Sequence, residues 1–356
     1  MAQFAFRDVD AFCRRVLPGL RKTQATNLSW VLFGLLCSGR PSLSAVARWM
    51  VGPVRLIHRI KRVHRFIDNP RLPRGQLLAQ MVYFNWLRAA GRPRPTVVID
   101  WTDLGKDTVS LWMALVSQGR TVPLLCRVLP KKTAQGSRNQ AEHDLILTLK
   151  ALVGTGWVLV ADRGFARASL FEMLLQEHLD FVIRFDDDTT VWVKNKPRRC
   201  GDLRLKGACS RWLGAVRYQS LRRVPVQVLL CEAEGSRWNL ATSLPTKAQV
   251  AKIYYSRMQI EEMFRDLKQH LHIEKMPCTT LARTATWLLL CALAYSYLYW
   301  LGVLGTEREL SERYHYWKTA SVLWLGLQLV RHHDPWLAKL TRRLLLPKPI
   351  PIPKSG

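Results

Sequence analysis

The sequence predicts a mixed α/β protein in which a basic, helical first part precedes a sheet covered by helices. Apolar residues recur at helical spacing through residues 1–95. From residue 96 onward, short β-branched runs alternate with amphipathic stretches, which is the pattern of strands and helices packed in layers. The chain has 356 residues, 48% of them hydrophobic, so it can bury a sizeable core and form two or three domains.

The first 95 residues carry a strong positive charge, with 17 Lys and Arg against three acids, or 17 − 3 = +14. A short helix is expected at 42–50, the Val-Gly-Pro at 51–53 breaks it, and a second helix is expected within 54–70. The pair is like a helix-turn-helix whose second helix is basic. Its candidate DNA-binding residues are Arg55, Arg59 and Arg62. The alternative is a solvated face on an ordinary helical bundle, although like charges at helical spacing repel one another.

The whole chain is also basic, with 54 Lys and Arg against 26 Asp and Glu and a formal net charge of +28. A field of this sign attracts polyanions, of which nucleic acid is the usual one. A ribosomal or membrane-surface protein could share the charge. The 14 Trp and the apolar content argue against a disordered basic tail.

Two features bear on the compartment. The eight Cys form no CxxC pair and no zinc-like spacing with His, so we expect reduced thiols in a cytoplasmic protein. Residues 286–305 carry no charge and are long enough to span a bilayer. A buried core helix explains the same segment, and a membrane protein with one span stays as a rival interpretation.

After a linker at 91–96 the pattern changes to strands alternating with helices. The expected strands are 96–100, 108–115, 120–129, 156–162 and 180–185, and the expected helices are 139–154 and 167–179. A β-rich segment at about 186–248 interrupts this pattern and is interpreted as an insertion. Beyond residue 272 the chain is helical again, and it closes with a proline-rich tail at 346–356. These changes predict a helical, basic domain at 1–95, an α/β domain at 96–305 and a helical C-terminal region at 306–356.

Residues 254–270 are expected to form one helix with two different faces. On an ideal helix Tyr254, Arg257, Glu261 and Lys268 fall within about 60° of one another, while the apolar residues gather on another face. One face is therefore expected to pack on a core. The other presents a phenol, a guanidinium, a carboxylate and an ammonium in a row.

Two more acids, Asp100 and Asp162, are expected at the ends of buried strands. An unpaired carboxylate is costly to bury, and ligands bind at the carboxyl ends of strands in open α/β sheets. With Glu261 they make three carboxylates, a set that suits two Mg²⁺ or Mn²⁺ ions and in-line phosphoryl transfer. The alternatives are that Asp100 caps a turn, that Asp162 pairs with Arg163, and that Glu261 is an ordinary i,i+4 partner.

The spacing Tyr-x2-Arg-x3-Glu-x6-Lys over 254–268 resembles the Y-R-E-K signature of the DDE transposases of bacterial insertion sequences, the IS-four group. The resemblance extends to VVIDWTDLG at 97–105 and VADRGF at 160–165, which look like the segments that hold the family's two aspartates. RIKRVHRFIDNPRL at 59–72 is similar to its DNA-binding segment, and RWNLATSLP at 237–245 to the end of its β insertion.

The resemblance implies an RNase H-like catalytic domain, interrupted by a β-strand insertion and preceded by an all-helical DNA-binding domain. It implies that Asp100, Asp162 and Glu261 are catalytic and hold two divalent metal ions. By the same resemblance Tyr254 and Arg257 contact phosphates near a flipped base, and Lys268 also meets DNA. Trp238 would stack on that base; the alternative for Trp238 is a strand residue of the core.

The combined prediction is a cytoplasmic DNA transposase, associated with the nucleoid when bound to DNA and with no membrane partner. It would bind double-stranded DNA at the inverted terminal repeats, cut it through a hairpin intermediate and join the 3′ ends to target DNA. Synapsis of two ends implies a homodimer on DNA. The rivals are a metal-dependent nuclease or resolvase without strand transfer, and a catalytically dead, repressor-like DNA-binding protein.

Overall fold

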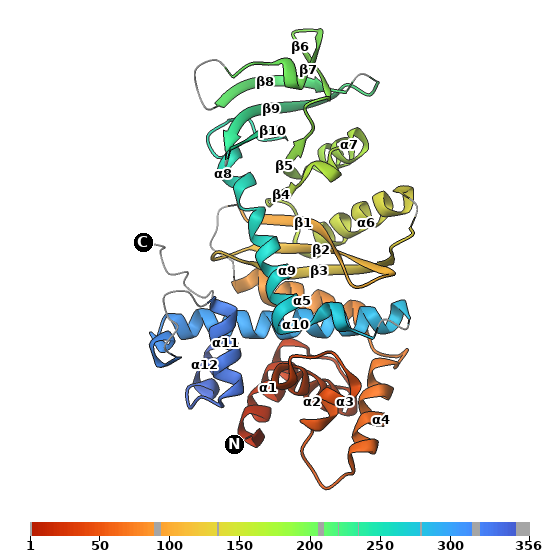
Figure 1. Cartoon of the computed structure of the whole chain (residues 1–356), viewed down its shortest axis with the longest axis vertical. Helices are drawn as coiled ribbons and strands as arrows, with labels where there is room; N and C mark the ends of the chain where they lie inside the picture. Colours follow the sequence, from red (N-terminus) through yellow and green to blue (C-terminus); the bar gives the residue numbers. More distant parts are fainter. Residues whose placement is uncertain are drawn as a thin grey trace.

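The computed structural model describes residues 2–88, 94–133, 135–205, 210–219, 221–233, 235–277, 280–314 and 321–346. Within this part, one large mixed sheet lies between layers of helices (Figure 1). Most of the predicted proline-rich tail and part of the predicted linker at 91–96 lie outside the described residues. The division into domains at 95 and 305 stays a prediction.

The first part of the chain is helical. Its helices are α1 (Ala2–Val16), α2 (Lys22–Ser38), α3 (Leu43–Arg48), α4 (Leu56–Ile67) and α5 (Arg74–Arg88). The two predicted helices around the Val-Gly-Pro break are thus present as α3 and α4. Ser42 stands at the N-cap of α3 in an extended conformation, as a helix start requires.

The sheet has ten strands in the described part of the chain. They are β1 (Thr96–Asp103), β2 (Thr108–Val116), β3 (Thr121–Pro130), β4 (Val158–Ala161), β5 (Asp180–Phe185), β6 (Thr190–Val193), β7 (Lys196–Arg199), β8 (Ser210–Tyr218), β9 (Val224–Ala233) and β10 (Ser236–Thr242). Their spatial order is β3-β2-β1-β4-β5-β10-β9-β8-β6-β7. The strands expected from the sequence are confirmed, but β1 runs three residues beyond the expected end at Asp100.

The sheet has two halves of different character. In the first, β2 and β3 run antiparallel to β1, while β4 and β5 run parallel to it. In the second, the strands of the predicted insertion continue the same sheet, because β10 pairs antiparallel with β5. This β-rich segment is therefore an extension of the sheet edge rather than a separate layer (Figure 1).

Helices cover both faces of the first half. One face carries α9 (Met258–His270), α10 (Leu281–Thr306), α11 (Val322–Arg331) and α12 (Leu337–Leu344), with α1–α4 beyond them. The other face carries α6 (Gln135–Val153) and α7 (Ala168–Gln176). Alternation along β1 separates the two cores: Val98 belongs to the core on the α9 and α10 side, whereas Val97 and Ile99 belong to the core on the α6 side.

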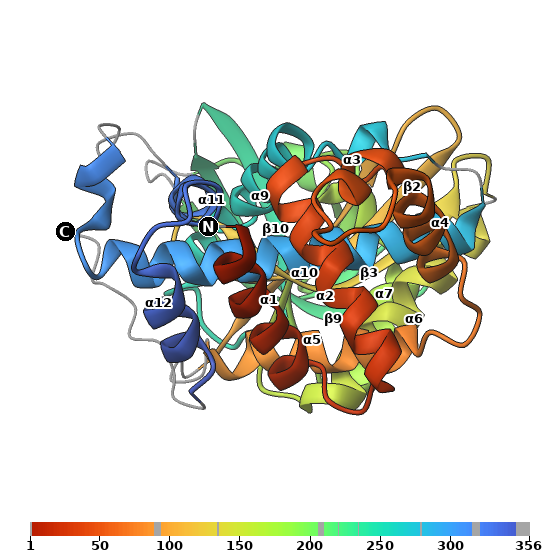
Figure 2. The same cartoon turned by 90° about the horizontal axis from the view of Figure 1, so that it is seen from below.

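Helix α10 is the helix of the described part that is long and apolar enough to cross a membrane, and its apolar window is fully buried in the structure. It runs between the sheet and the N-terminal helices, and α1 and α2 lie against it in the view from below (Figures 1 and 2). This environment favours the core-helix interpretation of residues 286–305. Figure 2 also shows α11 and α12 beside α10, near the N-terminus.

The single helix predicted over 254–270 is wrong. The structure has α8 (Val250–Tyr255) and α9, joined by a turn at Ser256 and Arg257. Two hydrogen bonds of the tighter i→i+3 kind form here, from Arg257 N to Tyr254 O and from Ile260 N to Arg257 O. The Ser256 hydroxyl also donates to the Ile253 carbonyl at 2.6 Å, and such side-chain bonds compete with regular helix geometry.

Candidate active site

The register of the parallel strands brings Asp100 and Asp162 side by side. Val98 of β1 pairs with Val160 of β4, and each aspartate follows two residues later. Neighbouring strands are about 4.8 Å apart, so the two carboxylates share one edge of the sheet. Asp100 lies within β1 rather than at its end, but it stands just past the last residue pair between β1 and β4.

Asp100 is a largely buried carboxylate with another acid beside it. Its side chain is 19% exposed, and Oδ1 accepts a hydrogen bond from the Trp101 amide at 2.8 Å. Burial, and then the negative charge of Asp162, raise the pKa of Asp100 to about 7. Arg257 lowers the pKa only in part. A cation bound beside Asp100 and Asp162 would therefore be electrostatically favourable.

Asp162 stands at the N-cap of the short turn Arg163–Phe165. Its Oδ1 accepts a hydrogen bond from the Gly164 amide at 2.9 Å, which sets the direction of the side chain. The alternative pairing with Arg163 is not what the structure has, because Arg163 instead pairs with Asp186 at 3.3 Å. A backbone hydrogen bond therefore sets the direction of the Asp162 carboxylate at the end of β4, and Arg163 does not pair with it.

Arg257 joins the third carboxylate to the first. Its Nη2 donates to Glu261 Oε1 at 2.8 Å, and its Nη1 lies 3.7 Å from Asp100 Oδ2. The Arg257 side chain is 15% exposed, whereas Glu261 is 47% exposed. The i,i+4 pairing considered for Glu261 is thus present, and it is also the link that brings α9 to β1.

No group of three or more His, Cys, Asp or Glu side chains in the described residues is arranged to hold a metal ion as the side chains stand. The position of Arg257 is the physical reason we see, because its guanidinium takes the place of a counter-ion between Asp100 and Glu261. The donor set still fits a hard divalent cation: Asp100 and Asp162 are adjacent oxygen donors of like charge. Glu261 would join them by giving up its contact with Arg257.

Tyr254 and Trp238 form an aromatic pair behind this edge. Each is 4% exposed, and their rings meet edge to face with centroids 4.9 Å apart. Trp238 Nε1 donates to the Ser236 hydroxyl at 3.0 Å. This geometry is that of the strand-core alternative for Trp238. Burial raises the pKa of Tyr254, and Arg257 and Arg184 oppose the rise.

The other predicted DNA-binding residues lie elsewhere. Lys268 is seven residues beyond Glu261, about 10 Å along the helix, and pairs with Glu274 at 2.9 Å. On α4, Arg59 donates to the carbonyls of Met50, Gly52 and Val54 and so holds the turn before the helix. Arg62 Nε donates to Asn27 of α2. Arg55, by contrast, is exposed at the start of α4.

Sequence reasoning missed a buried carboxylate beneath the site. Glu142 of α6 is 4% exposed. It accepts a hydrogen bond from Trp101 Nε1 at 2.9 Å and an ion pair from Arg167. Because Trp101 follows Asp100 and Arg167 follows the Asp162 turn, Glu142 connects the segments after both aspartates. No signal in the sequence set Glu142 apart, because it stands in the polar run NQAEHD at 139–144, where an acid is ordinary.

Comparison with known families gives the class of protein. A family model described as a transposase DDE domain matches residues 92–297, more than half of the chain. The chain belongs to this family of DDE transposases, and the matched region contains the aspartates, Glu261 and the aromatic pair.

One similar protein is the "Probable transposase for insertion sequence element IS5377" of Geobacillus stearothermophilus. The two are 27% identical over 150 residues, which is 40% of this chain and 39% of that protein. The chain thus matches well under two thirds of this relative's length.

Proposed function

We propose that the protein is a transposase of the IS-four group that binds the inverted terminal repeats of its own element, cuts there and joins the 3′ ends to target DNA. The observation that carries this proposal is the register of β1 and β4, which sets Asp100 beside Asp162 and within reach of the α9 residues. Membership of the DDE transposase family supports DNA transposition as the overall activity.

Asp100, Asp162 and Glu261 are the residues that would hold Mg²⁺ or Mn²⁺, two ions in all. When bound, such ions supply charge stabilisation for the attacking and leaving oxygens of an in-line phosphoryl transfer. The raised pKa of Asp100 supports this role, because burial and the neighbouring charge of Asp162 disfavour its ionised form and a bound cation would stabilise that form. Water then cleaves one strand and leaves a 3′-OH.

The chain's own side chains position the DNA. Arg257 carries a planar fork that suits either a carboxylate or a phosphate, so it can exchange Glu261 for the scissile phosphate. Tyr254 lies behind it with a hydroxyl as a single donor, and Lys268 contributes a point charge farther along α9. Trp238 would have to leave its contact with Tyr254 to stack on a base.

We further propose an RNase H-like catalytic domain at 96–305, preceded by a helical DNA-binding domain at 1–95 and followed by a helical region at 306–356. The order β3-β2-β1-β4-β5, antiparallel and then parallel, supports that fold. The enzyme would work as a homodimer on double-stranded DNA, at the nucleoid in the cytoplasm. The first 3′-OH would attack the opposite strand and form a hairpin that is later opened.

The experiment incubates purified protein with Mg²⁺ and labelled DNA that carries the ends of the element, beside Asp162→Ala. We expect end-specific nicks, hairpins and joined products from the parent and none from the variant. Cleavage without joined products would favour the nuclease rival. Binding without cleavage by the parent, in both Mg²⁺ and Mn²⁺, would favour the repressor-like rival.

A further inference from the structure

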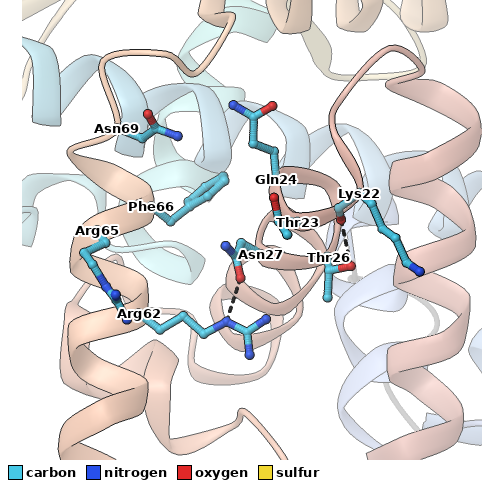
Figure 3. Close-up of a pocket in the computed structure, with 9 residues that line it drawn as sticks. All are labelled: Lys22, Thr23, Gln24, Thr26, Asn27, Arg62, Arg65, Phe66 and Asn69. Atoms are coloured by element: carbon cyan, nitrogen blue, oxygen red, sulfur yellow. Dashed lines mark hydrogen bonds between the residues drawn. The ribbon is translucent and has the colours of Figure 1, made fainter.

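A polar pocket lies between α2 and α4, far from the carboxylates of the catalytic edge. Its volume is about 530 Å³, and its lining includes Lys22, Asn27, Arg62, Arg65, Phe66 and Asn69. Figure 3 shows Arg62 reaching from α4 across to Asn27 of α2, with Lys22 and Arg65 on opposite sides. The pocket is thus built from two separate helices of the predicted DNA-binding region.

The pocket concentrates positive charge with nothing to neutralise it. Lys22, Arg62 and Arg65 line it, and among its described lining residues none is acidic. None of these three cations forms an ion pair with a carboxylate in the described part of the chain. Burial, and then the nearby Arg65, lower the pKa of Arg62, as expected where cations crowd together without a counter-ion.

The rest of the lining suits an anion as well. Lys22 is the first residue of α2, a helix of 17 residues, so the first turn of this helix, where its positive end lies, borders the pocket. Arg62 Nε donates a hydrogen bond to Asn27 Oδ1 at 2.6 Å. The two terminal nitrogens of Arg62 therefore remain for a ligand. Threonine, glutamine and asparagine side chains complete the polar wall.

We propose that this pocket binds phosphate groups of the DNA backbone, with Arg62 at its centre and Lys22 and Arg65 on either side. The inference rests on the proposed function and names the place where residues 1–95 grip DNA. Duplex DNA is favoured over a free phosphate because α4 continues past the pocket with the exposed cations Arg55 and Lys61. An extended polyanion can contact both regions at once.

The sharpest variant is Asn27→Asp. It has the same shape, keeps an acceptor for Arg62 Nε and places a carboxylate inside the pocket, so the fold is retained while the anion site is filled. Lys22→Ala removes a cation at the rim. The control for Lys22→Ala is Lys196→Ala, which changes the charge by the same amount. Lys196 is an exposed residue of β7, at the opposite end of the molecule (Figure 1).

Fluorescence anisotropy would measure binding of a random-sequence duplex from 50 to 300 mM NaCl, roughly the range over which such binding collapses. Asn27→Asp and Lys22→Ala should each weaken binding about tenfold and lower the salt slope by about one. Lys196→Ala should leave both unchanged. If both pocket variants match Lys196→Ala while the parent binds and cuts DNA, the pocket inference fails and the proposed function stands.

A second arm separates the two sources of phosphate. Inorganic phosphate at millimolar concentration, in a background of constant ionic strength, should raise the melting temperature of the parent more than that of Asn27→Asp. If this difference appears while the DNA salt slope is the same in both proteins, the pocket serves a free anion and the inference is overturned. A parent that neither binds nor cleaves duplex DNA would remove the proposed function itself.

Discussion

Arg257 donates to Glu261 at 2.8 Å across one turn at the start of α9. The same guanidinium lies 3.7 Å from Asp100, so one side chain joins the helix to the strand that carries the first aspartate. The arginine is therefore a counter-charge for both acids. Binding of a divalent ion and release of Arg257 toward a phosphate are therefore expected to be linked.

The first prediction concerns Arg257→Lys. Lysine keeps the charge but cannot grip a phosphate through a planar fork once it has left Glu261. We expect cleavage of element ends to fall about 10- to 100-fold, which corresponds to the loss of one hydrogen bond to a charged group. Arg265→Lys is the matched control, because Arg265 lies on the same helix and, among the described residues, pairs with Glu262 alone. Equal activity of the two variants would contradict this role.

The second prediction concerns Asp100 and pH in metal-free buffer with EDTA. The folded-state pKa of about 7 lies above the ordinary value of 3.8, so folding retains a proton that the unfolded chain has already lost. This carboxyl therefore lowers the free energy of unfolding progressively as pH rises from about 4 to about 7, and no further above that. Asp100→Asn removes this effect.

The stability advantage of Asp100→Asn over the parent should accordingly grow between pH 5 and pH 7 and then level off. Urea unfolding of both proteins at pH 5, 6, 7 and 8 measures this difference, in which the titrating groups remote from Asp100 cancel. A difference that stays constant over that range would show that Asp100 titrates normally.

The third prediction is that Glu142 is a positioning residue. Glu142→Gln keeps an acceptor for Trp101 but leaves the partly buried Arg167 without its charge partner. The segments after Asp100 and Asp162 would shift, so the Mg²⁺ concentration for half-maximal cleavage should rise about tenfold or more while the Kd for DNA stays the same. The control is Asp144→Asn on the same helix, which should change neither value. The Asp144 side chain is 41% exposed and pairs with Arg127 at the surface.

Loss of a buried partner also costs stability, about 3–5 kcal/mol in comparable pairs. The comparison is therefore made below the melting temperature of the variant, checked by circular dichroism. A uniform loss of active protein would lower the rate at every Mg²⁺ concentration without moving the midpoint. Such a result would assign Glu142 a purely structural role.

The placement of Asp100 and Asp162 could be predicted because it depends on local patterns. Each follows a short β-branched run, and the carboxyl ends of parallel strands meet at one edge of a sheet. Glu261 was predicted from helical spacing, and the structure brings it to Asp100 through Arg257. The catalytic roles of these residues stay predictions.

Other features depend on contacts that no local pattern contains. The Glu142–Trp101 bond spans 41 residues and requires α6 to lie on the face of β1 opposite α9. Arg59 was expected to face DNA because of its charge, yet its guanidinium is engaged by three backbone carbonyls of the preceding turn. The break between α8 and α9 likewise coincides with a hydrogen bond from the Ser256 hydroxyl to the Ile253 carbonyl, which helical periodicity does not reveal.

The last prediction concerns the contact between α10 and α11, where two glycines allow the helices to touch backbone to backbone. A Cβ at Gly302 would lie 1.7 Å from the Val322 carbonyl oxygen, and one at Gly326 would lie 1.9 Å from that of Leu298. Either Gly→Ala change forces the helices apart and should lower the free energy of unfolding by about 3 kcal/mol or more.

The control for these two variants is Gly75→Ala in α5, where an added Cβ meets nothing within 4 Å. This change should alter the free energy of unfolding by less than about 1 kcal/mol. Urea unfolding in the absence of DNA measures all three variants. Because α10 is buried along its apolar window, the glycine variants should expose that surface early and aggregate on heating. Wild-type stability in Gly302→Ala and Gly326→Ala would mean that the two helices do not approach this closely.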